Sequence, residues 1–206
     1  MNKRRRKTGF RARPSALHRL ALLLLASSAS ANAAVICSSM THLDVPATSE
    51  GVYLNLITGT WGVRESDVPG FDIDIYAAVN TNPTGQLKFY WGPASNGGAG
   101  VVSSGVSYAV LGSNVTIGAD SAFTREGFTG DTSVWMAGTS GYLGMRFRDE
   151  SSASIVYGWL GLTTTAALGF PATIEGWCYE DSGASIVTPD PRPDAIFADG
   201  FDVVPL

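Results

Sequence analysis

Two carboxylates separated by a single residue, Asp72 and Asp74, lie in a stretch where apolar and polar residues alternate. Successive side chains of a strand point to opposite faces, so both carboxylates project from one face and can converge. Two carboxyl groups about 5–10 Å apart are the machinery of a glycosidase, and carboxylate oxygens are also the ligands that Ca²⁺ prefers. The chain has no D-x-D-x-D-G loop, and a solvent-facing strand surface is the simpler interpretation. We retain Asp72 and Asp74 as candidate calcium ligands and predict no other metal site and no cofactor.

Serine hydrolase chemistry needs a histidine base beside the nucleophile. Apart from His18 in the basic N-terminal segment, the chain offers His42, for which a solvated or capping role is the simpler interpretation. No G-x-S-x-G elbow occurs, and phosphate loops, G-x-G-x-x-G and H-E-x-x-H are absent from the sequence. His42 and two cysteines do not make a zinc site of the usual composition. The sequence therefore predicts no catalytic residues.

Aromatic side chains offer a different kind of site, because indole faces suit the apolar face of a sugar ring. Large aromatics in a β-sandwich are core residues in most cases. Trp61 and Trp135 lie nearest to predicted turns, so we expect these two to be the ligand-binding surface candidates. The full aromatic set is Trp61, Tyr90, Trp91, Trp135, Trp159 and Trp177.

The two cysteines, Cys37 and Cys178, lie near opposite ends of the predicted domain. In an oxidising compartment such a pair predicts a disulfide, and two buried free thiols are the alternative. A bridge between them would close almost the whole domain, for which the chain-entropy relation gives about 4–5 kcal/mol.

Short strands must position these residues, because period-2 alternation recurs along the chain with Gly, Asn and Pro turns between the segments. We predict a single all-β domain over residues 35–187, an antiparallel β-sandwich with a jelly-roll-like arrangement. The expected strands are 51–57, 71–79, 86–91, 101–110, 114–118, 133–137, 142–147, 154–164 and 172–179.

The N-terminal segment has the features of a secretory signal peptide. Eight of the fourteen basic residues lie within residues 1–19, a short apolar run follows at 20–26, and small residues end in Ala31-Asn32-Ala33. A basic region, a short apolar region and an A-x-A site predict export, with cleavage after Ala33 or Ala34. The apolar run falls short of the roughly 20 residues that span a bilayer.

Charge beyond residue 34 excludes one class of partner. Six basic residues against eighteen acidic ones give this part of the chain a formal charge of −12. Phosphate backbones are bound by clustered Lys and Arg, so we predict no nucleic-acid partner.

A proline-rich linker and an acidic–aromatic tail, residues 188–206, follow the predicted domain. Three prolines within 189–193 favour an extended, disordered segment. Phe197 and Phe201 lie four residues apart among acidic residues, a spacing that suits recognition by a partner groove such as that of a sorting machinery. A solvated end without a role is the alternative.

Two segments resemble a known group of proteins. Tyr157-Gly158-Trp159-Leu160-Gly161-Leu162, and Ile174 to Ile186 with its Trp177-Cys178-Tyr179 centre, are similar to the C-terminal strands of exported bacterial β-sandwich proteins, many with PEP-CTERM-type sorting tails. The resemblance implies an exported β-sandwich and carries no activity. The chain lacks the Pro-Glu-Pro segment and apolar helix of that tail, so we expect no stable membrane anchor. Its Ile196–Asp202 segment is instead similar to short tails on exported Gram-negative proteins.

Together these observations predict an exported, non-enzymatic surface, matrix or interaction protein that is periplasmic, cell-surface or extracellular. The alternative is a carbohydrate-binding module that uses exposed aromatics, with a glycan or surface component as partner. A hydrolase is the third hypothesis.

Overall fold

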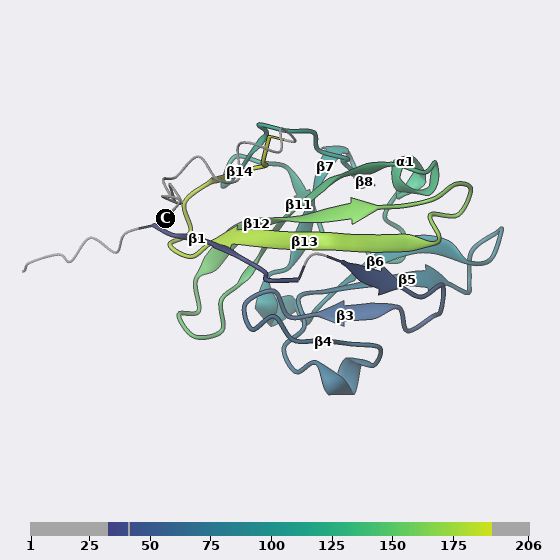
Figure 1. Cartoon of the computed structure of the whole chain (residues 1–206), viewed down its shortest axis with the longest axis horizontal. Coiled ribbons are helices and arrows are strands. Elements are labelled where there is room, and N and C mark those ends of the chain that lie inside the picture. The colour runs from purple at the N-terminus through teal and green to yellow at the C-terminus, as the bar shows by residue number, and fades with distance from the viewer. Residues whose placement is uncertain (1–32, 41, 191–206) are drawn as a thin grey trace, which may run out of the picture. The chain divides into compact units, whose positions relative to one another are not determined.

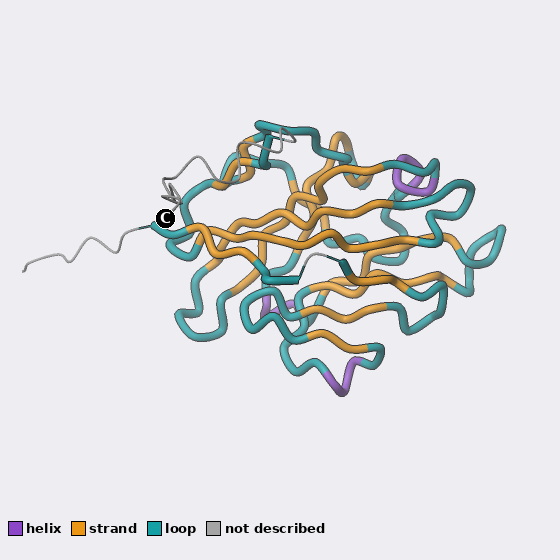
Figure 2. The backbone as a smooth tube through the Cα atoms, viewed as in Figure 1, coloured by secondary structure: helices purple, strands orange, loops and turns teal. Residues whose placement is uncertain are grey.

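The structure is a computed structural model of the chain that describes residues 33–40 and 42–190. In this part the chain is almost entirely β, and its named strands all pair antiparallel (Figures 1 and 2). This confirms the predicted all-β, sandwich-like single domain. The predicted signal peptide lies outside the described residues except for Ala33 and Ala34, and so do Phe197, Phe201 and the rest of the tail from residue 191.

The larger sheet is dominated by three nine-residue strands that lie side by side in Figure 1. Its order among the described residues is β1-β13-β12-β11-β7-β10, with β2 beside β13 and β8 beside β7. The strands are β1 (Val35–Cys37), β2 (Leu43–Val45), β7 (Ala99–Ser104), β8 (Ser107–Tyr108), β10 (Phe123–Thr124), β11 (Ser140–Arg148), β12 (Ile155–Thr163) and β13 (Ala172–Glu180).

The smaller sheet has the order β4-β3-β5-β6 in the described part of the chain. Its strands are β3 (Val52–Leu54), β4 (Trp61–Gly62), β5 (Ile73–Ala78) and β6 (Gln86–Trp91), and β9 (Thr116–Ile117) pairs separately with β14 (Ile186–Val187). The hairpin β5–β6 places Ile75 opposite Phe89 and Ile73 opposite Trp91.

One hydrophobic core joins the two sheets, because apolar side chains of both belong to the same buried cluster. The smaller sheet contributes Leu54, Ile73 and Phe89, and the larger contributes Met145 and Leu160. Leu143, Met145 and Phe147 face inward together, as the alternation in 142–147 predicts.

Each sheet is also covered on its outer face. On the larger sheet, the segments that carry β9 and β14 lie over Val101 and Cys178, with Trp159 packed against this second cluster. On the smaller sheet, the segment around the short 3₁₀ helix η1 (Glu65–Asp67) packs Val68 and Phe71 against Tyr53. Residues that period-2 alternation places on an outward face are therefore buried at these positions.

Two sequence expectations differ from the structure. Residues 133–137, expected as a strand, contain the helix α1 (Ser133–Met136), because the amides of Trp135 and Met136 both donate to the carbonyl of Thr132. The expected domain boundary after residue 187 divides a hydrogen-bonded segment. Thr188 is buried, and its hydroxyl donates to the carbonyl of Gly112 at 2.7 Å.

Candidate functional site

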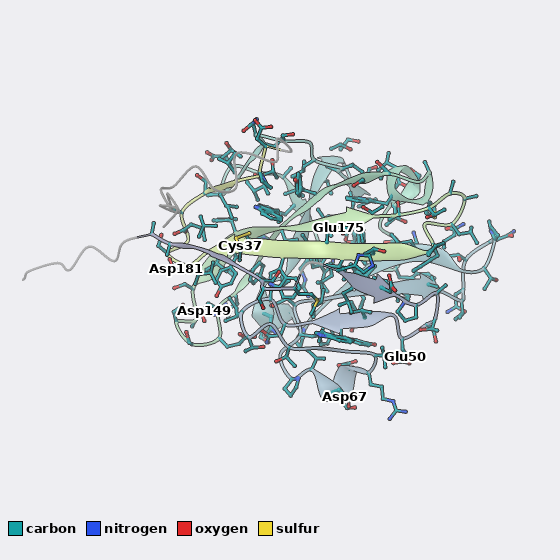
Figure 3. The ribbon with its side chains drawn as sticks, viewed as in Figure 1. Cys37, Glu50, Asp67, Asp149, Glu175 and Asp181 are labelled. Atoms are coloured by element: carbon teal, nitrogen blue, oxygen red, sulfur yellow. A yellow bond between two sulfur atoms is a disulfide. The ribbon has the colours of Figure 1, made fainter. Side chains whose placement is uncertain are left out.

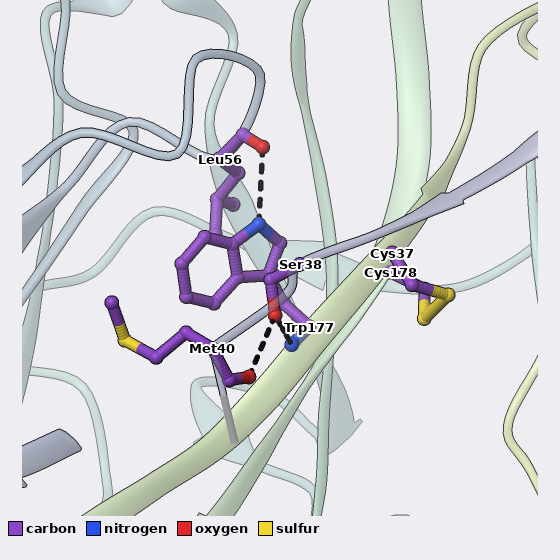
Figure 4. Close-up of a disulfide and its surroundings, with 6 residues drawn as sticks. All are labelled: Cys37, Ser38, Met40, Leu56, Trp177 and Cys178. Carbon is purple, nitrogen blue, oxygen red and sulfur yellow. Dashed lines mark hydrogen bonds between the residues drawn. A yellow bond between two sulfur atoms is a disulfide. The ribbon is translucent and has the colours of Figure 1, made fainter. Parts of the chain in front are cut away.

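The disulfide predicted from the sequence is present and fixes the first strand. Cys37 of β1 lies directly opposite Cys178 of β13, with an S–S distance of 2.05 Å (Figure 4). Just beyond it, the hydroxyl of Ser38 donates to the carbonyl of Met40 at 3.1 Å and accepts from the amide of Trp177 at 3.2 Å. The crosslink and these bonds together anchor β1 on the edge of the larger sheet.

A groove with a volume of about 570 Å³ lies beside this crosslink, and we refer to it as the disulfide groove. Its lining includes both half-cystines, Trp159, and residues of β1 and of the segment around β14. The lining is mostly apolar. The complete set is Val35, Cys37, Trp159, Cys178, Ser185, Ile186, Val187, Pro189 and Asp190.

Exposed apolar residues form the rim of the disulfide groove. Val35 is 59% exposed and Val187 is 50% exposed, although both belong to strands. Large apolar side chains on the surface of a domain are common singly, but their convergence on one hollow is typical of a binding site.

Trp159, which lines the disulfide groove, carries an indole N–H that makes no hydrogen bond in the described structure. Its indole Nε1 is buried and has no hydrogen-bond partner among the described residues. The ring is held in place by an edge contact with Tyr142, whose centroid lies 5.1 Å away. A buried N–H without an acceptor is costly.

The candidate calcium ligands are placed differently from the sequence expectation. Asp72 and Asp74 do point to the outer face of the smaller sheet, but they are 1% and 2% exposed, so the expected solvent-facing position is wrong. The segment over this face shields them from water. The sequence pattern shows the alternation of β5 but not this covering layer.

Burial changes the chemistry of these two carboxyl groups. It raises the pKa of Asp72 to about 8, opposed by a hydrogen bond from the amide of Leu56 to Oδ2 at 2.8 Å. It raises the pKa of Asp74 to about 8 as well, with a further contribution from the charge of Glu50. Oδ1 of each group has no hydrogen-bond partner in the described structure.

A calcium role gains no support from the geometry. Within residues 33–40 and 42–190, no three His, Cys, Asp or Glu side chains gather in an arrangement that could hold a metal ion. Asp72 and Asp74 are better described as buried, proton-binding groups of the sheet.

The two tryptophans chosen from the sequence separate into different environments. Trp61 of β4 is 45% exposed, as expected of a surface candidate. Trp135 is wholly buried against Phe89, at a ring-centroid distance of 6.0 Å, so its expected surface position is wrong. A platform made of both rings is therefore not formed.

His42 lies on the surface between two carboxylates. Its Nε2 is 3.3 Å from Asp44 Oδ1 and its Nδ1 is 3.8 Å from Glu175 Oε2, and the histidine side chain is 64% exposed. Exposed pairs of this kind contribute little to stability.

The disulfide groove has no recognisable signature in the local sequence. Trp159 was one of six aromatics, and nothing in its local pattern distinguishes a half-buried ring with an unpaired N–H from a core ring. One feature of the sequence could have indicated the groove. A disulfide between Cys37 and Cys178 brings the first strand close to the apolar residues that precede the proline-rich linker.

Comparison of the chain with protein-family models, curated proteins and solved structures gives no significant match in any of the three. In the described part of the chain, no helix has the length and apolar character needed to span a bilayer.

Proposed function

We propose that the protein is an exported, non-enzymatic binding protein that holds a small, neutral, apolar molecule in the disulfide groove. The observation that carries this proposal is a mostly apolar hollow lined by Trp159, whose buried indole Nε1 has no hydrogen-bond partner among the described residues. Small-molecule sites are typically hollows of about 300–1,000 Å³ with apolar walls and a few polar groups that fix orientation.

The chemistry of the groove restricts the ligand. The indole N–H requires a hydrogen-bond acceptor, while the disulfide, Val35 and Val187 favour an apolar body. Asp190 on the lining and the formal charge of −12 beyond residue 34 disfavour anions. A neutral ester or ketone with a medium-length alkyl chain has these properties.

Export is supported by the leader sequence and by the disulfide, which persists in oxidising compartments. The non-enzymatic role is supported by the absence of a nucleophile or acid–base motif in the sequence and by the exposed position of His42. The resemblance to exported β-sandwich proteins points to the same location.

Displacement of a neutral fluorophore, N-phenyl-1-naphthylamine, tests the proposal with methyl decanoate and decane as competitors. We expect methyl decanoate to displace the fluorophore. Trp159→Phe should weaken the binding of methyl decanoate about 2–10-fold, which corresponds to the loss of one hydrogen bond. The affinity for decane should not change. Val187→Asp should abolish the binding of both competitors. Val63→Asp, which changes a 48% exposed valine outside the groove, should leave both affinities unchanged.

Two outcomes would contradict the proposal. One is equal loss of ester and decane binding in Trp159→Phe, since the donor would then have no specific role. The other is binding that begins only when the chain is truncated after Asp190, which would mean that the groove takes the chain's own tail.

A carbohydrate-binding function is the second candidate, favoured by Trp61. Its exposed ring follows two threonines whose hydroxyls are 3.0 Å apart, Thr58 and Thr60, so a flat apolar surface lies near sugar-like hydrogen-bonding groups. A glycan array with wild type and Trp61→Ala tests it: signals that disappear in the variant support this function, and signals that persist exclude Trp61 as the site.

A further inference from the structure

The first described residues make a contact that bears on where the chain is cut. The amide nitrogen of Ala34 donates to Oδ1 of Asp181 at 2.9 Å, and the amide of Asp181 donates to the carbonyl of Ala34 at 3.1 Å. Asp181 therefore holds Ala34 at two points, although 147 residues separate them in the sequence. Asp181 lies at the same end of the larger sheet as Cys37 (Figure 3).

The carboxylate of Asp181 is positioned by a structured turn. Glu180, which precedes it, is buried, and its carboxylate accepts hydrogen bonds from the amides of Ser182 and Ala184 at 3.1 and 2.5 Å. The neighbouring ladder pairs Val35 with Glu180 and Ile36 with Tyr179. The Ala34–Asp181 contact thus extends the β1–β13 ladder by one position, with a side-chain oxygen in place of a carbonyl.

We infer that Ala34 is the first residue of the mature protein and that Asp181 is the binding site for its α-ammonium group. Hydrolysis of the Ala33–Ala34 bond breaks the acyl C–N bond. Water supplies an oxygen to the new carboxylate of Ala33 and protons to the new amine of Ala34. The nitrogen that donates as a neutral amide before cleavage then carries a positive charge 2.9 Å from a carboxylate oxygen.

The alternative cut, after Ala34, lacks this fit. It removes the residue that Asp181 holds and places the ammonium on Val35, a rim residue of the apolar disulfide groove. It also places Asn32 rather than Ala31 three residues before the cut, which departs from the A-x-A pattern. Geometry and sequence therefore select the bond between Ala33 and Ala34.

Several acidic groups of the described residues lie near this terminus. Glu180 faces Val35 across the ladder, Asp190 lines the groove with Val35, and Asp149 and Asp181 both act on the hydroxyl of Tyr179. All favour a positive terminus, so the effect of Asp181 must be isolated by substitution. Asp181→Asn keeps an oxygen acceptor and removes only the charge.

The inference rests on the export part of the proposed function, and the first measurement separates the two. The intact mass of protein recovered from the exported fraction should correspond to a chain that begins at Ala34. A chain that begins at Val35, or at any other site beyond the leader, overturns this inference while leaving export intact. A chain that still begins at Met1 overturns both.

Titration of the terminal amine tests the role of Asp181. Beyond residue 34 the sequence has a single lysine, Lys88, so ¹³C reductive methylation of the mature chain yields two signals. The pKa of the Ala34 amine should be roughly 0.3–0.7 unit higher in wild type than in Asp181→Asn, the shift equivalent to an exposed ion pair. Asp120→Asn removes an exposed carboxylate elsewhere and should leave that pKa in place.

Equal amine pKa values in wild type and Asp181→Asn would overturn the assignment. If Asp181→Asn does not fold, the wild-type amine is compared with the same chain in urea, where an α-amine has a pKa of about 7.7–8.0. A folded value no higher than the unfolded one would overturn the assignment in the same way.

Discussion

At the residue scale, the buried carboxyl groups of Asp72 and Asp74 have the clearest consequence. Each is raised from an ordinary pKa of 3.8 to about 8 by burial. At pH values between 3.8 and about 8, each of these two carboxyl groups is protonated in the folded protein and ionised in the unfolded chain. The free energy of unfolding must therefore fall as the pH rises through this window.

Asp74→Asn should flatten that dependence, because an amide does not titrate. One proton contributes at most about 1.4 kcal/mol per pH unit, so wild type should lose as much as about 4 kcal/mol more than the variant between pH 5 and pH 8. Urea unfolding at several pH values measures this. At pH 3.5 the variant should match wild type, and Asp120→Asn should follow the wild-type curve throughout. Parallel curves for Asp74→Asn and wild type would show that Asp74 is ionised in the fold.

The contrast between Trp135 and Trp61 gives a second prediction at this scale. Trp135→Ala should cost about 3–5 kcal/mol of stability, because a wholly buried aromatic leaves a cavity. Trp61→Ala should cost far less, since nearly half of that side chain is exposed. Chemical denaturation of both variants decides the matter. The reverse order would place Trp135 on the surface, as expected from sequence.

These residues also show which features the sequence could predict and which it could not. Alternation placed Ile73 and Ile75 inward and Asp72 and Asp74 on the opposite face, and the structure agrees on both faces. It could not show that the opposite face is covered, because that depends on where a distant segment packs. The expected surface position of Trp135 is wrong for a different reason. Thr132 starts one turn of helix within a stretch whose local pattern favours a strand or turn.

At the element scale, the disulfide ties β1 to β13, the strand beside it in the larger sheet. Its half-cystines are 141 residues apart in sequence, so the bridge closes a loop that contains most of the β-domain. The prediction from Cys37 and Cys178 was confirmed because two cysteines allow a single pairing. The groove beside them was not predicted, because it depends on the path of β14.

Replacement of both half-cystines by serine should lower the free energy of unfolding by about 2–5 kcal/mol. Denaturation of the double variant, compared with wild type under oxidising conditions, measures the loss. Wild type under reducing conditions should approach the double variant. No difference among the three would mean that the bridge does not form in the protein.

The end of the domain gives another prediction. Thr188 exchanges backbone hydrogen bonds with Val115 and Asn114, and its hydroxyl bonds Gly112 and the amide of Val115. Truncation after Val187 should therefore lower the free energy of unfolding by roughly 1–3 kcal/mol, the value of a few buried hydrogen bonds. Truncation after Asp190 should leave the thermal midpoint unchanged. A fall in the midpoint after the second truncation would show that residues beyond Asp190 stabilise the domain.

At the scale of the whole molecule, export, crosslink and groove form one account. The sandwich core supports the two sheets, the disulfide secures the first strand, and the groove lies where that strand meets the end of the domain. The formal charge of −12 beyond residue 34 is compatible with the neutral ligand that we propose.

The most direct test of this account is the indole region of a ¹⁵N-edited NMR spectrum during titration with methyl decanoate. The five tryptophans of the chain give five indole signals, and the Trp159→Phe variant identifies the one from Trp159. We expect the Trp159 signal to move downfield as its N–H acquires an acceptor, while the Trp61 signal stays in place. Saturation with no movement of the Trp159 signal, or movement of the Trp61 signal instead, would contradict it.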